Sequence, residues 1–511
     1  MKKNTILLVI TIIFLTSCGS NIYPIFPVLN NNSNIEKQNS LFSIAKTEVD
    51  SIYNSIDIDK DSKISKDESN LSINDLNEMD INNDGKISKD ESIKYYTNQI
   101  QYLSQGQTTF DNNFVVNSTF SEHRNINPAS QFQSNKVELF IDGNEIYPMV
   151  YETLNKAKSS IQIDLFVLGG KIGQKVADIL IEKFKSGVDV RVIHDPSLGF
   201  GGPTKKQIMP VIESLKNNGV PFRLYPINLM PTFKKSGLLT NRFQIDHNKL
   251  MVIDKEIAIM GGMNMFDAAE FNHDLMFKIT GPLAIDLSKD LEYEWNLPGN
   301  PFNSLSPYLP DVTLPQLEDA NYKLRVIKTD INERSTKTVL IDNINNAKSK
   351  IYIAMFEFSD PDIIAALVKA KKRGIDVRVL FDRKNLNGKY IPIVKIPDGM
   401  PNLYPIDELL KVQTSVKWYN PQLNGEELHM KLAIFDSKKV ICGSSNFTTQ
   451  ALTTFRETSF EMIGDEIPLK LEKMFLHDWE VRGTLITKLT LKQKLIVSMI
   501  KFMDKRYISW W

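Results

Sequence analysis

The sequence carries the same spaced set of polar residues twice. The two sets are His247-x-Lys249-x4-Asp254-x6-Gly261-Gly262-x-Asn264 and His429-x-Lys431-x4-Asp436-x6-Gly443-Ser444-x-Asn446. Their internal spacing is identical, and the two histidines lie 182 residues apart. With roughly one chance in twenty at each fixed position, coincidence does not produce both sets in one chain. The repetition therefore indicates a site built from two equivalent halves.

The residue types in each set suit an anionic ligand. A histidine and a lysine two residues apart on a strand point to the same side of a sheet. Each half then offers one imidazole and one ammonium to a common point, and Asn264 and Asn446 add neutral hydrogen-bond donors. The glycines before each asparagine would let the backbone come close to an anion. Two such halves facing one point form a site for a tetrahedral phosphate.

This duplicated motif resembles the signature of the phospholipase D superfamily. The resemblance covers about residues 136–484, and the residues flanking both motifs look most like the cardiolipin synthase and phospholipase D branch. It implies an α/β fold with two repeated α/β/α sandwich domains, and an active site at the interface of the two copies. Because the sequence has no His-x-His or His-Glu-x-x-His pattern, we expect no metal or other cofactor at the catalytic site.

The resemblance implies a mechanism with two histidines in different roles. One histidine attacks phosphorus to form a phosphohistidine, and the other protonates the departing alkoxide and then activates water or an acceptor alcohol. By analogy His247 is the nucleophile and His429 the acid/base, although the symmetry of the motifs allows the reverse. Lys249, Lys431, Asn264 and Asn446 would hold the phosphoryl oxygens.

Family members also place an acidic residue downstream of each motif to orient the histidine. Asp274 lies 27 residues after His247, and Glu457 lies 28 residues after His429. The matched spacing favours this pair, with Glu461 as a competing choice in the second copy. We expect Asp254 and Asp436 to stabilise turns rather than to contact substrate.

The elements around the motifs are repeated as well. Residues 159–166 match 349–356, and residues 187–192 match 374–379. Between these paired strands each copy carries a helical pattern, at 176–185 and 363–372, which ends before a glycine. Strands that alternate with helices in two copies predict duplicated α/β units. The apolar runs that follow each His-Lys pair predict strands buried between helical layers.

Charge and cysteine content narrow the class of protein. The 511 residues include 61 basic and 61 acidic side chains, so the chain is neither a strongly cationic nucleic-acid binder nor an acidic disordered protein. The net charge is +2 over residues 1–18, −7 over 19–135, 0 over 136–484 and +5 over 485–511. Two cysteines exclude a disulfide framework and a four-cysteine zinc site.

The N-terminus has the pattern of a bacterial lipoprotein signal. Lys2 and Lys3 precede an apolar run at residues 6–15, which is too short to span a bilayer. The run ends in Leu15-Thr16-Ser17-Cys18, which resembles the lipobox, where the cysteine is acylated. We therefore expect an extracytoplasmic protein of the bacterial cell envelope, lipid-anchored through Cys18.

These features predict a chain of successive segments. The expected order is signal peptide 1–18, tether 19–41, calcium-binding pair 42–103, linker 104–135, first catalytic repeat 136–300, linker 301–323, second repeat 324–484 and basic tail 485–511. The tail mixes six basic residues with an apolar helical face and ends in Trp510-Trp511. It could lie on a bilayer interface or dock on the catalytic body.

Two acidic patterns in the small N-terminal segment resemble EF-hand calcium loops. Their ligand positions are Asp57, Asp59, Asp61, Ser65 and Glu68 in the first loop, and Asp80, Asn82, Asp84, Lys86, Ser88 and Glu91 in the second. Ser62 replaces the turn glycine of the first loop, whereas the second has Gly85. The isoleucines at position 8 of each loop would pair, forming a small, α-helical EF-hand-like module that binds structural Ca²⁺. A solvating acidic linker and a dockerin-like protein-binding role are the alternatives.

The motifs together predict a membrane-anchored phosphodiesterase that hydrolyses or transfers phosphatidyl groups. Its expected partners are a phospholipid membrane and a phospholipid substrate, and we expect it to act as a monomer. A nuclease of the same superfamily is the main alternative; the neutral catalytic region argues against this because phosphate-tracking grooves need excess basic residues. A calcium-dependent adhesion or scaffold protein with a vestigial catalytic fold is the third reading.

Overall fold

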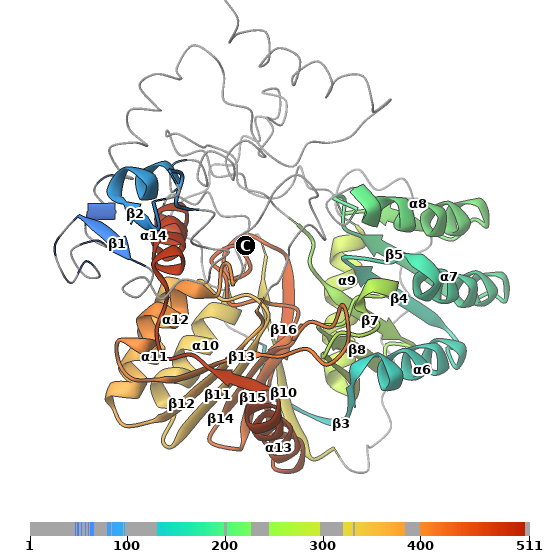
Figure 1. Ribbon diagram of the computed structural model, residues 1–511. Helices are drawn as coiled ribbons and strands as arrows, with labels where there is room; N and C mark the ends of the chain where they lie inside the picture. The colour runs from blue at the N-terminus through green and yellow to red at the C-terminus, as the bar shows by residue number, and fades with distance from the viewer. Residues whose placement is uncertain are drawn as a thin grey trace, which may run out of the picture.

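The computed structural model describes residues 130–198, 202–225, 245–296, 320–330, 333–383 and 399–505, together with separate positions between 46 and 97. These residues form a mixed α/β fold around one large mixed sheet (Figure 1). Cys18, Asp59, Asp61 and Glu68 lie outside the described residues, as do 506–511.

The first half of the sheet comes from residues before 300. Its strands are β3 (Gln133–Ile141), β4 (Ser160–Leu165), β5 (Asp189–His194), β6 (Phe222–Leu224), β7 (Lys249–Ile253), β8 (Ile257–Gly261) and β9 (Leu275–Thr280). They lie in the order β3-β9-β8-β7-β4-β5-β6, with β4, β5 and β6 parallel to one another. The edge strand β6 is short, which limits the unpaired backbone at that side.

The second half repeats this order. Its strands are β10 (Tyr322–Thr329), β11 (Lys350–Met355), β12 (Asp376–Phe381), β13 (Ser415–Tyr419), β14 (Lys431–Phe435), β15 (Lys439–Gly443), β16 (Glu457–Ile463) and β17 (Gly483–Leu485). The order β10-β16-β15-β14-β11-β12-β13 matches that of the first half, and β17 adds an outer strand. The two halves join where β10 pairs antiparallel with β3. The sheet therefore runs continuously from one copy into the other.

Helices cover both faces of the sheet. They are α6 (Asp142–Asn155), α7 (Gly170–Lys185), α8 (Gly202–Asn217), α9 (Pro282–Trp295), α10 (Ser335–Asn346), α11 (Pro361–Lys372), α12 (Leu403–Leu410), α13 (Glu466–Val481) and α14 (Leu491–Lys505). α6 to α8 bury one face of the first half, and α10 to α12 bury the matching face of the second (Figure 1). On the other face α9 and α13 pack on an apolar cluster that includes Leu250 and Leu432. One core thus spans both copies.

The repeated helices predicted between the paired strands are confirmed. α7 ends at Lys185 and α11 at Lys372, and the glycines that follow, Gly187 and Gly374, have φ of 93° and 90°. A residue with a side chain rarely adopts this left-handed conformation, so a glycine is suited to end each helix. All residues of β7 and β14 are buried, as the apolar runs predicted.

The acidic N-terminal segment contains a two-stranded sheet. β1 (Lys63–Ser65) pairs antiparallel with β2 (Lys86–Ser88), and Ile64 lies opposite Ile87, as the loop pattern predicts. The Asp80 carboxylate accepts hydrogen bonds from the backbone of Asp84 and of Gly85. Within the described part of the chain, no group of three or more His, Cys, Asp or Glu side chains is gathered to hold a metal ion.

The C-terminal helix α14 uses its apolar face inside the protein. Leu491, Leu495, Met499 and Ile500 are at most 1 % exposed, and they share one core cluster with Tyr53 and other residues of the N-terminal segment. Figure 1 shows α14 between that segment and α12. Of the two readings of the tail, the structure shows the docked helix. The bilayer-interface reading is wrong for this face because the residues it requires at the surface are buried.

A membrane-spanning helix was sought among the described residues. None of their helices combines the length and the hydropathy that crossing a bilayer requires.

Candidate active site

The two histidine motifs meet at the junction of the two halves. Lys249 and Lys431 are the first residues of β7 and β14, and each histidine stands two residues earlier. Short bridges then join the copies: Asp246 pairs with Arg456, and His273 pairs with Leu428. Each histidine is therefore fixed by backbone from the other copy. The site is assembled from both halves at once.

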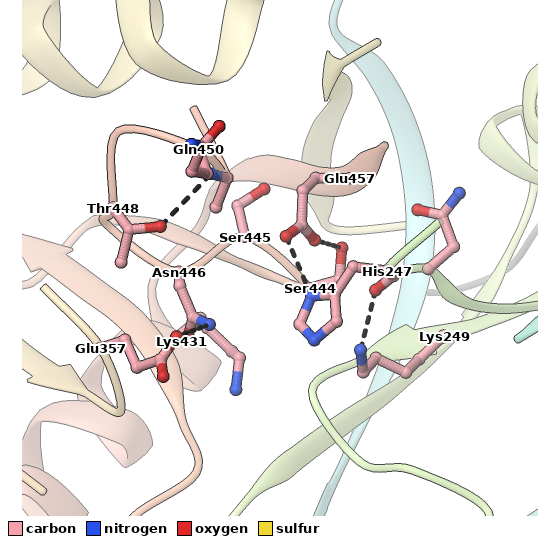
Figure 2. A network of polar contacts seen from close by, with 12 residues as sticks. His247, Lys249, Glu357, Lys431, Ser444, Ser445, Asn446, Thr448, Gln450 and Glu457 are labelled. Atoms are coloured by element: carbon pink, nitrogen blue, oxygen red, sulfur yellow. Dashed lines mark hydrogen bonds and ion pairs between the residues drawn. The ribbon is translucent and has the colours of Figure 1, made fainter. Parts of the chain in front are cut away.

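Glu457 of the second copy holds His247 of the first. Its Oε1 lies 2.9 Å from His247 Nδ1, and Ser444 Oγ donates a hydrogen bond of 2.5 Å to Oε2 (Figure 2). The histidine backbone N–H also donates to Arg456 O at 2.8 Å. With Nδ1 engaged by the carboxylate, Nε2 is left to face a substrate. Glu457 and His247 are both buried.

Asp274 of the first copy holds His429 of the second. Its Oδ2 lies 2.6 Å from His429 Nδ1, and the histidine N–H donates to His273 O at 3.0 Å. The two carboxylates are thus exchanged between the copies. The sequence spacing places each carboxylate downstream of a histidine of its own copy, whereas the structure pairs it with the histidine of the other. Spacing along the chain carries no information on this crossing.

The glycines of the first motif make room for this carboxylate. A Cβ added at Gly262 would lie 2.2 Å from Asp274 Oδ1, and one at Gly261 would lie 2.2 Å from Leu275 O. The expectation that these glycines bring the backbone close to an anionic ligand is therefore corrected, because the space is filled by the protein itself. At the position equivalent to Gly262, Ser444 instead donates to Glu457.

The two lysines have similar surroundings, except that Lys431 Nζ also lies 3.2 Å from each ring nitrogen of His429. Lys249 Nζ donates to His247 O at 2.8 Å and lies 4.9 Å from the ring centre of Phe166. In the other copy Lys431 Nζ donates to His429 O at 2.6 Å and lies 4.9 Å from the ring of Phe356. Both lysines are 2 % exposed. A buried ammonium group is stabilised by a nearby anion. The two lysines therefore favour binding of the non-bridging oxygens of a phosphate at this point.

Burial and charge set the protonation of the site. Burial and the two neighbouring ammonium groups lower the pKa of His247 well below its usual value, so this imidazole is neutral at pH 7. Burial also lowers the pKa of Lys249 to about 7 and raises that of Asp274 to about 7. Burial likewise raises the pKa of Glu457. Such shifts are typical of catalytic groups.

The two asparagines differ in their contacts. Asn446 Nδ2 donates to Glu357 Oε2 at 3.0 Å (Figure 2), and Tyr147 Oη donates to the backbone oxygen of Asn264 at 3.0 Å. The side-chain oxygens of both asparagines are buried, and among the described residues neither has a hydrogen-bond partner. Glu357 was not singled out in the sequence, because the matching position of the first copy is Val167.

Asp254 and Asp436 lie away from the histidines, in turns. Asp254 accepts hydrogen bonds from the backbone N–H groups of residues 158–160, and Asp436 accepts the equivalent bonds from 348–350. These bonds hold the pKa of each carboxyl below its usual range. Both residues tie the turn after the motif strand to the start of the neighbouring strand.

Two further residues of the second copy are Glu461, the competing carboxylate, and Cys442. Glu461 Oε2 contacts Arg325 and its Oε1 accepts from Asn343, so it does not contact a histidine. Cys442 is buried in β15, where burial raises the pKa of its thiol, in keeping with an unreactive cysteine.

Sequence reasoning missed the residues directly before the two carboxylates. Arg456 Nη1 lies 2.8 Å from Asp164 Oδ2 and 2.7 Å from Asp246 Oδ1, and Nη2 contacts Glu294. His273 contacts two carboxylates in the other half-site. One feature of the sequence could have pointed to them: Glu457 directly follows Arg456 and Asp274 directly follows His273, and both preceding residues can carry a positive charge.

Comparisons with known proteins identify the family of this chain. The family model described as "Cardiolipin synthase, PLD-like domain" matches residues 150–295 and 340–479. Cardiolipin synthase B of Salmonella typhimurium is 26% identical over 74% of this chain and 85% of its own length. The major cardiolipin synthase ClsA of Bacillus subtilis is 26% identical over 81% of this chain and 78% of its own.

A solved structure shares the fold. The phosphatidylserine synthase of Haemophilus influenzae Rd KW20 superposes with a TM-score of 0.54 at 15% identity, covering 75% of this chain and 96% of its own. This likeness supports the arrangement of the two halves.

Proposed function

The chain belongs to the cardiolipin synthase family of PLD-like phosphatidyltransferases, and from this premise we propose that it transfers a phosphatidyl group from a phospholipid to an alcohol. The observation that carries the proposal is the crossed pair of histidine–carboxylate contacts beside two buried lysines. This set presents two differently placed imidazoles to one anionic phosphate.

The first step is attack on phosphorus by His247. Glu457 accepts its Nδ1 proton in a hydrogen bond, so the Nε2 lone pair forms the new P–N bond while the bond to the leaving alcohol breaks. The carboxylate then stabilises the positive charge that develops on the imidazole. Lys249 and Lys431 stabilise the extra negative charge on the phosphoryl oxygens.

His429 moves the protons in both steps. It donates a proton to the departing alkoxide, then accepts one from the incoming alcohol, whose oxygen attacks phosphorus and releases His247. Asp274 keeps this ring in place through its contact to Nδ1. With water in place of the alcohol, the same steps give hydrolysis.

A direct assay tests the proposed reaction. Purified full-length protein is incubated with phosphatidylglycerol vesicles, and the products are identified by mass spectrometry. We expect cardiolipin and free glycerol, with neither formed by His247→Ala. Phosphatidic acid as the sole product would identify a hydrolase, and cleavage of single-stranded DNA without lipid turnover would identify a nuclease.

We also propose that the second acidic loop binds Ca²⁺ as a structural ion. The donor set is oxygen-rich: Asp80, Asn82, Asp84 and Glu91 supply side-chain oxygens, and Gly85 has a φ of 80°, which suits the turn. Lys63 Nζ lies 2.5 Å from Asp84 Oδ2, so Ca²⁺ has to displace the Lys63 ammonium group before it can bind this carboxylate. We expect Ca²⁺ to raise the melting temperature and a chelator to leave turnover intact.

We propose in addition that the protein is anchored to the extracytoplasmic side of a bacterial membrane by acylation of Cys18. Support comes from the lipobox-like sequence and from the membrane lipid, cardiolipin, that the names of its relatives contain. Metabolic labelling with palmitate should mark the wild-type protein in cells and leave Cys18→Ser unlabelled. Equal labelling of both proteins would exclude this anchor.

A further inference from the structure

His273 occupies an unusual position beside the active site. Its Nδ1 lies 2.7 Å from Asp142 Oδ1 and its Nε2 lies 2.9 Å from Asp478 Oδ2. A neutral imidazole has one N–H, and its other nitrogen would face a carboxylate with a lone pair. Only the doubly protonated ring donates to both carboxylates. With both aspartates ionised, this geometry requires His273 to be an imidazolium.

This ring is tied to the catalytic groups through short contacts. Asp142 Oδ1, which accepts from the ring, also accepts from the Asp274 backbone N–H at 3.1 Å. The Asp274 backbone oxygen in turn accepts from the Asp142 N–H at 3.0 Å. The carbonyl of His273 itself accepts from the His429 N–H at 3.0 Å. Asp274 and His429 thus both take their positions from the segment that His273 anchors.

The equivalent place in the other half-site holds a permanent cation. Arg456 precedes Glu457 as His273 precedes Asp274, and its guanidinium contacts Asp164, Asp246 and Glu294. Arginine stays charged at all accessible pH values, whereas a histidine can lose its charge as the pH rises. One half-site is therefore clamped by a fixed charge, and the other by a charge that can be removed.

We propose that His273 is a positioning residue for His429. As an imidazolium between Asp142 and Asp478, it fixes Asp274 and, through Asp274, the acid/base histidine, so that its deprotonation loosens one half-site while the other stays intact. The inference rests on the proposed role of His429 in phosphatidyl transfer.

The charged groups around His273 support this role. Besides Asp142 of α6 and Asp478 of α13, Tyr419 of β13 stacks on the ring at 5.7 Å, and Glu426 and Arg482 bind Tyr419. His477 lies 3.6 Å from the other oxygen of Asp478. Although burial opposes the charge, the two carboxylates raise the pKa of His273 to about 9. Burial raises the pKa of Asp274, and the charge of His273 opposes this rise, which favours the carboxylate that His429 needs.

The test compares His273→Arg, His273→Gln and the wild type in phosphatidylglycerol turnover from pH 6 to pH 10. Arg456 indicates that a guanidinium can hold two carboxylates at this place. We expect the ratio of wild-type kcat to His273→Arg kcat to fall about tenfold as pH rises through about 9. His273→Gln should lower kcat at pH 7 by roughly 10- to 100-fold with little change in KM.

His477→Gln is the matched control, because this exposed histidine lies on α13 beside Asp478, the aspartate that His273 also contacts. It should keep the wild-type pH profile. A constant ratio of wild-type to His273→Arg kcat across the range, or a full kcat in His273→Gln, would overturn the inference.

A second measurement applies if the His273 variants do not fold. The ring of His273 is titrated by NMR in the wild type and in Asp478→Asn, which removes one counter-charge. In Asp478→Asn we expect a lower pKa of His273, and we expect the decline of kcat at alkaline pH to begin at a correspondingly lower pH. A lowered pKa with an unchanged alkaline decline of kcat would refute the positioning role. Absence of turnover in the wild type would instead count against the proposed function, since the titration does not depend on it.

Discussion

The two half-sites are built to the same plan with different parts. His247 is held by a glutamate that also accepts from Ser444, whereas His429 is held by a shorter aspartate in space left by Gly262. The cation before each carboxylate is Arg456 in one case and His273 in the other. Duplication therefore preserved the chemistry of the phosphate site while the supporting residues diverged, which gives the two histidines unequal environments.

The largest expected effect tests whether the two histidines have distinct roles. His247→Ala and His429→Ala should each lower kcat on phospholipid by about 10⁴-fold or more. With a p-nitrophenyl phosphodiester, whose leaving group needs no proton, His429→Ala should still release one equivalent of p-nitrophenol in a rapid burst. A burst in His247→Ala and none in His429→Ala would reverse the assignment.

The next effect concerns the length of the two carboxylates. Asp274→Glu should lower kcat by about 100-fold, because the longer side chain has no free space beside Gly262. Glu457→Asp should cost about tenfold, since it loses reach without a clash. The matched pair is measured at saturating substrate with circular dichroism as a folding control. Equal losses would show that the two pockets tolerate length alike.

A smaller effect should follow from exchanging the residues behind the carboxylates. Gly262→Ser places a Cβ 2.2 Å from Asp274 Oδ1 and should lower both kcat and melting temperature. Ser444→Gly removes one hydrogen bond to Glu457 and should lower kcat about tenfold while the fold persists. If Gly262→Ser were the milder change, the proposed packing difference would be wrong.

The smallest effect on activity is expected where the two copies are alike. Asp254→Asn and Asp436→Asn should each lower the free energy of unfolding by about 1–3 kcal/mol at pH 7, because each aspartate accepts several backbone hydrogen bonds. Their pKa values are lowered by folding, so this stabilisation is present above about pH 4 and is lost as pH falls further. Urea titrations at pH 7 and pH 3 measure it. Unequal losses in the two variants would show that the turns have also diverged.

The fold and the chemical groups of the site could be predicted because both depend on patterns within short stretches of the sequence. The spacing of His, Lys and Asn reflects a strand and a turn, and the helices of residues 176–185 and 363–372 follow from apolar periodicity and a terminal glycine. The pairing of His247 with Glu457 could not be predicted in this way. This pairing depends on how the two copies pack against each other. Because their sequences are similar, each carboxylate could contact the histidine of its own copy or that of the other.

The position of the C-terminal helix could not be predicted from its own sequence either, for an energetic reason. An amphipathic helix with basic residues satisfies its apolar face equally well against lipid or against protein. Leu491, Leu495 and Ile500 are buried because α12 and the N-terminal segment provide the partner surface. The sequence of residues 485–511 alone does not indicate which surface this helix packs against.

The exchange of carboxylates between the copies has a consequence for biosynthesis. Glu457 follows His247 by 210 residues, so His247 leaves the ribosome well before the carboxylate that contacts it. The first copy can fold as a unit while synthesis continues, but it does so without its partner carboxylate. The enzyme is therefore catalytically silent as a nascent chain. We expect it to become competent only after Glu457 has been made and the second copy has docked on the first.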